Sequence, residues 1–165
     1  MLAEIQDKIK YSHSKRRWLC TLAEFEREFP AGRAGKRRAQ LCYLEQCEPG
    51  IYENLRSILQ NNQAAADYLG IYNRSIDAAL LVAGHNVWPA SDYWADEIAA
   101  VARVESQAKP GRAYHLYPDP FAPGHLGCQC DDHSFRAPWL PSGQRACKHI
   151  LAFLLTTYIN QREEI

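Results

Sequence analysis

The chain has 165 residues, with 19 basic and 19 acidic side chains and a formal net charge of zero. A chain of this length can bury one ordinary core, or a helical core with a small appendage held by a metal. Its apolar runs are far shorter than the roughly 20 residues that cross a bilayer, so we expect no membrane-spanning segment.

The first hundred residues predict a helical bundle, because apolar side chains recur at helical spacing between glycine and proline breaks. We expect a first helix from about Leu2, and a second that carries Trp18, Leu22 and Phe25 and ends at Pro30. Further helices are predicted over 36–47, over 51–69 with Gly70 as its stop, over 73–83 with Gly84 as its stop, and over 91–106.

A boundary is predicted at Lys109-Pro110-Gly111, which divides the chain into a helical domain, 1–108, and a second domain, 109–165. After it, residues 112–117 alternate as a strand does, with Tyr114 and Leu116 on one face. A proline-rich loop then returns the chain to a second short strand at 125–130. The sequence therefore predicts a hairpin in the last third of the chain.

Four potential metal ligands lie in the second strand of this hairpin and in the segment after it. Cys128 and Cys130 are separated by one residue, sixteen residues follow, and Cys147 and His149 are again separated by one. Three thiolates and one imidazole fill a tetrahedral zinc site and leave no position for a reacting water, so the pattern indicates one structural Zn²⁺. The apolar period after Cys147 predicts a helix that begins at the second pair. His125 and His133 are close enough to compete as ligands, but we interpret them as loop histidines.

These residues resemble the SWIM zinc finger, whose pattern is Cys-x-Cys, a variable loop and Cys-x-His. The resemblance covers about residues 112–158 and extends to the run Cys147-Lys148-His149-Ile150-Leu151-Ala152. It implies a compact ββα finger that binds DNA, protein or both, as in chromatin-remodelling helicases, transposases and recombination-accessory proteins. The fold class we expect is mainly α, an N-terminal helical bundle followed by this small finger.

Several cations are candidates for nucleic-acid contacts. The run 8–18 mixes basic and aromatic side chains, a composition that grips phosphates and stacks on bases, although a solvated helix face is the alternative. Consecutive cations at 36–38 oppose the dipole of the helix they begin, which favours a role in binding a partner. The candidates are Lys15, Arg16, Arg17, Arg37, Arg38, Arg136, Arg145 and Lys148.

The remaining cysteines, Cys20, Cys42 and Cys47, are interpreted as thiols of a helical core. The start of the sequence lacks the pattern of a secretory leader, because Glu4, Asp7 and Lys8 interrupt its apolar residues. We therefore expect a reducing, cytoplasmic setting.

No catalytic arrangement and no phosphate-binding loop are recognisable, so we expect neither an enzyme nor a small-molecule substrate. The function expected is a zinc-binding accessory subunit of a nucleic-acid-processing complex, in recombination, transposition or defence, that binds DNA or RNA and a larger protein. The alternative is a purely protein–protein adaptor, which the acidic, aromatic middle of the chain favours: residues 50–107 hold three basic and seven acidic side chains.

Overall fold

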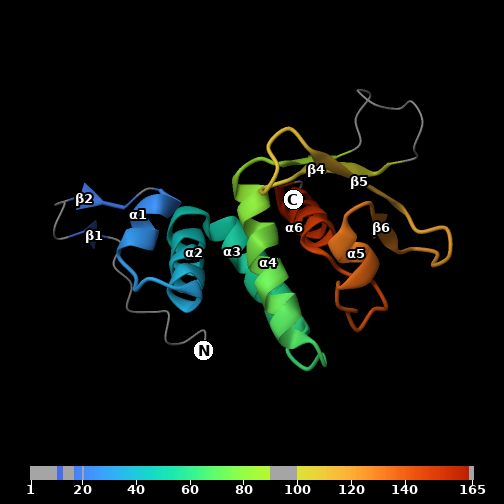
Figure 1. Ribbon diagram of the computed structural model, residues 1–165, viewed down its shortest axis with the longest axis horizontal. Coiled ribbons are helices and arrows are strands. Elements are labelled where there is room, and N and C mark those ends of the chain that lie inside the picture. The colour runs from blue at the N-terminus through green and yellow to red at the C-terminus, as the bar shows by residue number, and fades with distance from the viewer. Residues whose placement is uncertain (1–10, 13–16, 20, 90–99, 164–165) are drawn as a thin grey trace.

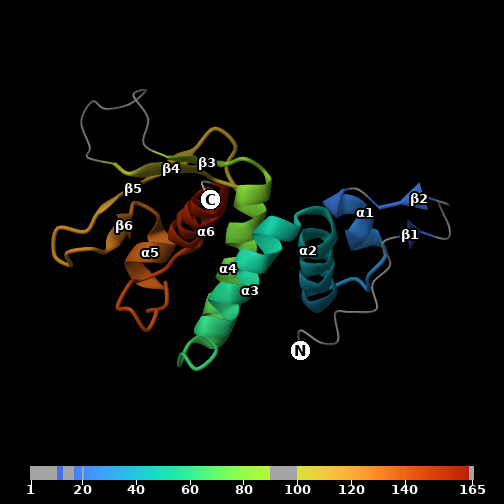
Figure 2. The same cartoon turned by 180° about the vertical axis from the view of Figure 1, so that it is seen from behind.

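The computed structural model describes residues 11–12, 17–19, 21–89 and 100–163. Two short strands precede four helices, and four strands and two further helices follow them along this part of the chain (Figures 1 and 2). The helices are α1 (Leu22–Arg27), α2 (Arg33–Cys47), α3 (Pro49–Asn61), α4 (Tyr68–Ala83), α5 (Asp131–Phe135) and α6 (Lys148–Glu163). The strands are β1 (Tyr11–Ser12), β2 (Arg17–Trp18), β3 (Val87–Pro89), β4 (Ala102–Glu105), β5 (Ala113–Pro118) and β6 (Leu126–Cys128).

The helices predicted over 36–47 and around Phe25 are present as α2 and α1, but Trp18 lies outside them. It belongs to β2, which pairs with β1, whereas α1 begins only after Thr21. The Thr21 hydroxyl accepts from the Glu24 backbone N–H and the Glu24 carboxylate accepts from the Thr21 N–H, a capping box that fixes this start. The helix expected from Leu2 lies outside the described residues.

The helix predicted over 51–69 is divided differently, and Gly70 is not its stop. α3 ends at Asn61 and α4 begins at Tyr68, so Gly70 lies in the first turn of α4. Asp67 explains the new start, because its Oδ1 accepts from the Gly70 backbone N–H at 3.2 Å and caps the helix. A side chain at position 70 would collide with this carboxylate. The predicted stop at Gly84 is confirmed as the C-cap of α4.

The sheet contains four strands in the order β3-β4-β5-β6, all antiparallel (Figure 1). The predicted hairpin supplies β5 and β6, in which Leu116 pairs with Cys128. The prediction of a helix over 91–106 is wrong for its last part, since Ala102–Glu105 forms strand β4. Residues 90–99 lie outside the described part of the chain. Ala102 and Val104 alternate into the core while both neighbours of β4 supply backbone partners, and this pairing overrides the local helical spacing.

The segment Lys109-Pro110-Gly111 forms the turn between β4 and β5. Arg112 donates its backbone N–H to the Lys109 carbonyl at 3.1 Å, and Gly111 has a φ of 81°, which favours glycine. The turn therefore joins two neighbouring strands of one sheet.

One hydrophobic core runs from the helices into the sheet. α6 lies between α4 and the sheet in both views (Figures 1 and 2) and packs against α3 and α4 as well as the strands. The core includes buried residues of α3, α4, α6 and the strands β4, β5 and β6, among them Leu55, Ile76, Val104, Leu116 and Leu151. A smaller cluster around Phe25 and Cys42 joins α1 to α2. None of the described helices has both the length and the apolar character needed to cross a bilayer.

Candidate metal centre

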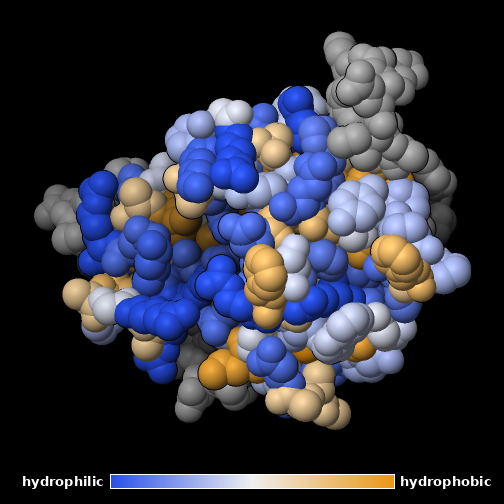
Figure 3. Space-filling model, turned by 45° about the vertical axis from the view of Figure 1, so that its right-hand side comes forward, coloured by the Kyte–Doolittle hydropathy of each residue, from blue (hydrophilic) through white to orange (hydrophobic). Residues whose placement is uncertain are grey.

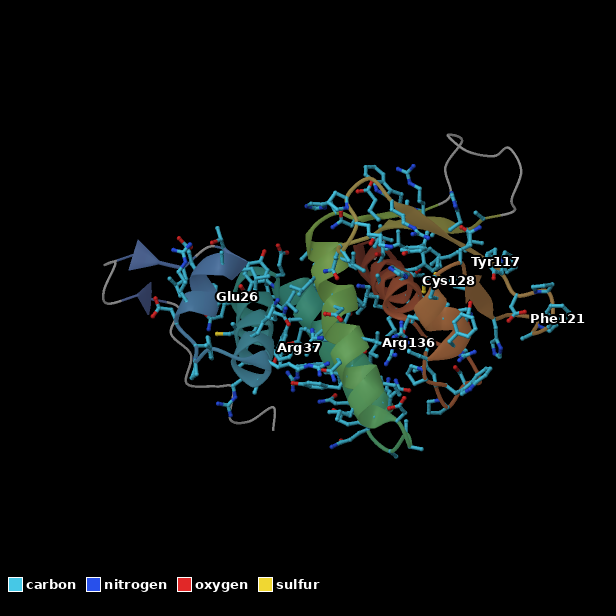
Figure 4. The ribbon with its side chains drawn as sticks, in the orientation of Figure 1. Glu26, Arg37, Tyr117, Phe121, Cys128 and Arg136 are labelled. Atoms are coloured by element: carbon cyan, nitrogen blue, oxygen red, sulfur yellow. The ribbon has the colours of Figure 1, made fainter. Side chains whose placement is uncertain are left out.

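The four predicted ligands come from three neighbouring elements and lie together. Cys128 ends β6, Cys130 is the N-cap of α5, and Cys147 and His149 stand at the start of α6. All four are buried, and Figure 4 shows Cys128 between the sheet and α6. The hairpin delivers one pair of ligands and the helix start delivers the other, as the spacing predicts.

The distances between the ligand atoms suit one tetrahedral ion. Their Sγ and Nδ1 atoms all lie within 4.8 Å of one another. His149 Nδ1 is 3.7 Å from the sulfur of Cys128 and 3.9 Å from that of Cys147. Metal–sulfur bonds of about 2.3 Å at tetrahedral angles place neighbouring sulfurs about 3.8 Å apart. The site is therefore preassembled and can hold a metal ion.

Backbone amides at two helix starts favour negative charge on the sulfurs. The His133 N–H donates to Cys130 Sγ at 3.3 Å, and the Ile150 N–H donates to the sulfur of Cys147. Unpaired amides in the first turn of a helix stabilise a thiolate in this way. Hence the helix start at Lys148 also prepares one ligand.

The three sulfurs titrate as one group, because they share hydrogen bonds in a buried space. Hydrogen bonds from Cys128 and Cys147 lower the pKa of Cys130. The pKa of Cys128 is raised, chiefly by its hydrogen bonds to Cys130 and Cys147 and then by burial. For Cys147, a hydrogen bond to Cys128 lowers the pKa, but the bond to Cys130 and burial raise it, to about 12 in all. A cation is what allows all three to ionise.

Packing, rather than a hydrogen bond, orients the His149 ring. Its Nδ1 faces the sulfurs, while its buried Nε2 has no hydrogen-bond partner among the described residues. The ring lies 4.7 Å from that of Tyr114 on β5, at an interplanar angle of 33°. Metal-ligating histidines usually donate their second N–H to an oxygen. Here the contact with the Tyr114 ring, in place of such a hydrogen bond, holds the imidazole in position.

Two further contacts fix the elements that carry the ligands. Arg74 of α4 forms an ion pair with Asp132 of α5, and its hydrogen bond is the main cause of the lowered pKa of Asp132. The side chain of Gln144 pairs with the backbone of Leu126 on the edge strand β6, accepting from its N–H at 2.7 Å and donating to its carbonyl at 2.8 Å. Gln144 thus replaces a neighbouring strand beside Cys128.

No protein-family model, curated protein or solved structure matches the chain. Its function is therefore inferred from the site and from the surface around it.

Other histidines and cysteines of the described residues are not part of the ligand group. Neither His125 nor His133 belongs to the group of four ligands. Cys42 lies in the core between α1 and α2, and Cys47 packs against it, in keeping with the interpretation of these thiols as core residues. Cys20 lies outside the described residues.

The cations proposed for nucleic-acid binding differ in whether they already form hydrogen bonds or ion pairs within the protein. Arg37 is largely buried between α2 and α4 (Figure 4) and donates to the Asp77 carboxylate at 2.6 and 3.2 Å. Arg145 donates to two backbone carbonyls, and Lys148 donates to Gln107 at 3.3 Å. Of the candidates whose side chains the structure describes, Arg38 and Arg136 are exposed. Arg17 lies on β2, and Lys15 and Arg16 fall outside the described residues.

Three supporting residues were not identified from the sequence as parts of the site: Arg74, Tyr114 and Gln144. The only signal for them in the sequence is the strand alternation that puts Tyr114 on the same face as Leu116, which is the face that meets α6. The spacing of residues along the sequence does not identify Arg74 or Gln144, because the tertiary fold determines which groups they contact.

Proposed function

We propose that the chain is a zinc-binding accessory subunit of a nucleic-acid-processing complex. The observation that carries the proposal is the buried, preassembled set of three sulfurs and one imidazole nitrogen. Borderline-soft Zn²⁺ is the common ion for such a tetrahedral ligand set. Four protein ligands complete the shell, so the ion would stabilise the fold and the chain would bind its partners without catalysing a reaction.

The SWIM-type assignment is part of this proposal. Its support is the pattern Cys-x-Cys and Cys-x-His together with the order of elements around it, since the hairpin β5–β6 precedes the first pair and α6 begins at the second. The chain adds β3 and β4 to the hairpin, and it inserts the short helix α5 between the two pairs of ligands. A reducing, cytoplasmic compartment would keep the three thiols available for zinc.

The support for nucleic-acid binding is a group of exposed cations. Arg33, Lys36 and Arg38 are exposed within the first two turns of α2. Positive side chains at the N-terminus of a helix oppose its dipole and lower its stability. Their companion Arg37 forms an ion pair with Asp77, whereas these three side chains are exposed and accessible to phosphates.

A fluorescence-anisotropy titration of the zinc-loaded full chain with labelled DNA and RNA, single- and double-stranded, tests the proposal. We expect affinity that falls steeply as salt rises. The triple variant Arg33→Gln, Lys36→Gln, Arg38→Gln should bind more weakly and with a smaller salt slope, while Arg56→Gln on α3 serves as the control. Absence of binding to every probe at low salt would remove the nucleic-acid role.

The alternative is a protein adaptor without nucleic-acid contact. It is favoured by Leu69 and Trp88, which are 70% and 48% exposed although large and apolar. Such residues are frequent in protein interfaces. Affinity purification of the full chain from its native host distinguishes the two: a stable protein partner with no nucleic acid, together with a negative titration, would favour the adaptor.

A further inference from the structure

Exposed aromatic side chains gather in the finger, outside the metal centre. The described residues include five large hydrophobic side chains that are exposed, and three of these, Phe121, Phe135 and Trp139, lie in the short stretch from β5 to the second ligand pair. Phe135 is 77% exposed at the end of α5 and Trp139 is 64% exposed four residues later. Exposed rings of this size are candidates for contact with a partner.

Trp139 is held in place although it is exposed. It forms a β-bridge with Arg145, and the turn between them is closed by a hydrogen bond from the Leu140 N–H to the Gln144 carbonyl at 2.8 Å. The guanidinium of Arg145 lies 5.5 Å from the centre of the indole. The ring is therefore presented on a built hairpin, and binding would cost little conformational entropy.

Arg145 also fixes the segment that carries Phe135. It donates to the Ser134 carbonyl and to the Ala137 carbonyl, each at 3.1 Å. The backbone on both sides of Phe135 and Arg136 is thus tied to the residue that contacts Trp139. We call these four residues, Phe135, Arg136, Trp139 and Arg145, the aromatic–arginine edge.

The charge of this edge is positive. The Arg136 side chain is 72% exposed, and its only acidic contact among the described residues is Asp132, at 4.0 Å. Asp132 is already engaged by the closer guanidinium of Arg74, at 2.8 Å. Arg136 is therefore available to a phosphate that lies beside the two rings.

We propose that the aromatic–arginine edge binds single-stranded nucleic acid, with bases stacked on Phe135 and Trp139 and a phosphate on Arg136. This inference rests on the proposed nucleic-acid role and names the strand form that this surface takes. Unpaired bases offer free faces to aromatic rings, whereas the bases of a duplex are stacked on one another. Arg145 adds a cation against the indole, which strengthens a stacking surface.

The surroundings of the edge fit a strand better than a folded protein. A protein interface needs a broad apolar centre. On the one face of the molecule shown in Figure 3, hydrophobic residues lie as separate groups among polar ones. Ser134, next to Phe135 in the chain, and Ser142, in the turn after Trp139, are polar and exposed. Two rings with one exposed guanidinium suit one or two nucleotides.

The test compares variants of the zinc-loaded full chain in titrations with single-stranded and duplex probes of the same sequence. Phe135→Ala and Trp139→Ala should each weaken single-strand binding roughly 5- to 150-fold, since one stacked base is lost. Trp139→Phe should retain most of the affinity, because a ring remains. Arg136→Gln should lower the salt slope by about 0.7, the value for one phosphate contact on a single strand.

Phe121→Ala is the matched control. Phe121 is 94% exposed at the outer end of the loop between β5 and β6, apart from Arg136 (Figure 4), and its loss should leave affinity unchanged. Each variant is first checked for one bound zinc and an unchanged circular dichroism spectrum. If an alanine variant fails this check, the test uses Trp139→Phe and Arg136→Gln instead. It is completed by measuring how an oligonucleotide quenches the tryptophan fluorescence.

The outcomes separate this inference from the proposed function. Single-strand binding that is equal in the wild type and in the ring variants overturns the inference and leaves the nucleic-acid role standing. Preferential binding of the duplex, or loss of a protein partner instead of the strand in Trp139→Ala, also overturns it. Absence of binding to any nucleic acid removes the proposed function itself.

Discussion

Arg74 of α4 and Asp132 of α5 form a two-pronged ion pair, in which Nε lies 2.9 Å from Oδ2 and Nη2 lies 2.8 Å from Oδ1. Asp132 stands two residues after the ligand Cys130, whereas Arg74 belongs to the helix at the centre of the molecule. Arg74 also donates to the Arg136 carbonyl at 3.3 Å. One side chain thus connects the ligand-bearing segment to a helix that is 58 residues away in sequence.

Removal of either member of this pair should destabilise the protein. Both side chains are mostly buried, with 21% and 28% exposed, so Arg74→Met and Asp132→Asn should each lower the free energy of unfolding by about 1–3 kcal/mol. The double variant should lose less than the sum, by at least about 0.5 kcal/mol. Urea denaturation of the three variants measures this coupling.

The control for this cycle is Arg56→Met, which removes an exposed pair with Glu53 at 3.5 Å. It should change the stability by less than about 0.5 kcal/mol. Strictly additive effects of Arg74→Met and Asp132→Asn would mean that the contact contributes nothing as a pair.

Two helical glycines should respond to alanine in opposite ways. A Cβ at Gly35 in α2 would collide with the Pro30 carbonyl oxygen, a backbone atom that cannot rotate away. Gly35→Ala should therefore cost about 2 kcal/mol or more, because the α1–α2 connection must shift. At Gly50 in α3 nothing lies within 4 Å of a Cβ, and Gly50→Ala should stabilise by about 0.5–1 kcal/mol.

Thermal and urea unfolding of both glycine variants check this contrast. Helix propensity alone gives the same sign for both positions. If Gly35→Ala were as stable as the wild type, the close packing of Pro30 on α2 would be incorrect.

The metal centre was predictable from the sequence because its ligands are set by local spacing. One intervening residue places Cys128 and Cys130 on the same side of an extended segment, and a helical period after Cys147 fixes where α6 begins. The two pairs of ligands lie far apart in sequence, but their chemistry predicts that they bind the same metal ion. No such constraint acted on Ala102 and Val104, whose strand exists only because β3 and β5 lie beside them.

The contacts that support the centre could not be predicted, because each joins residues from different elements. The ring of Tyr114 meets His149 only after β5 has packed against α6. Gln144 finds the backbone of Leu126 only because β6 is left as an edge strand. Spacing reveals periodic faces, whereas a single polar side chain acquires its partner from the tertiary fold.

Gln144 offers a test of this edge contact. Its Nε2 donates to the carbonyls of Leu126 and Arg145, at 2.8 and 2.6 Å, and the side chain is buried. Gln144→Glu removes both donated bonds and places a carboxylate against two carbonyl oxygens, so we expect a loss of about 2–4 kcal/mol in unfolding free energy.

Loss of these bonds should also lower the zinc affinity. Leu126 lies on β6, which carries the ligand Cys128, and Arg145 lies two residues before the ligand Cys147. A competition titration with a chromophoric chelator measures the affinity. Gln63→Glu, which places the same charge on an exposed residue, should behave as the wild type. Equal stability and affinity of the two variants would show that Gln144 is dispensable.

Removal of the metal should affect the core as a whole, because α6 is both the ligand-bearing helix and a central part of that core. Ile150, Leu151 and Leu155 follow the ligand pair directly and are fully buried among residues of α3, α4 and the sheet. Without an ion, the three sulfurs cannot all remain ionised in a buried space, and the start of α6 loses its attachment to β6. We therefore expect chelation, or Cys147→Ser, to lower stability by several kcal/mol, since structural zinc contributes roughly 10 kcal/mol or more of apparent binding energy in small fingers.

Thermal unfolding followed by circular dichroism, with zinc measured by elemental analysis, tests this expectation under reducing conditions. The wild type should bind one zinc per chain and unfold at a higher temperature than the chelated protein. Cys47→Ser, which lies outside the ligand group, should retain the ion and so controls for the loss of a thiol. Hydrogen exchange should show lost protection in α6 and in the facing turns of α4, because the two helices pack together. A chelated protein with unchanged protection in α6 would mean that the ion does not hold this helix in place.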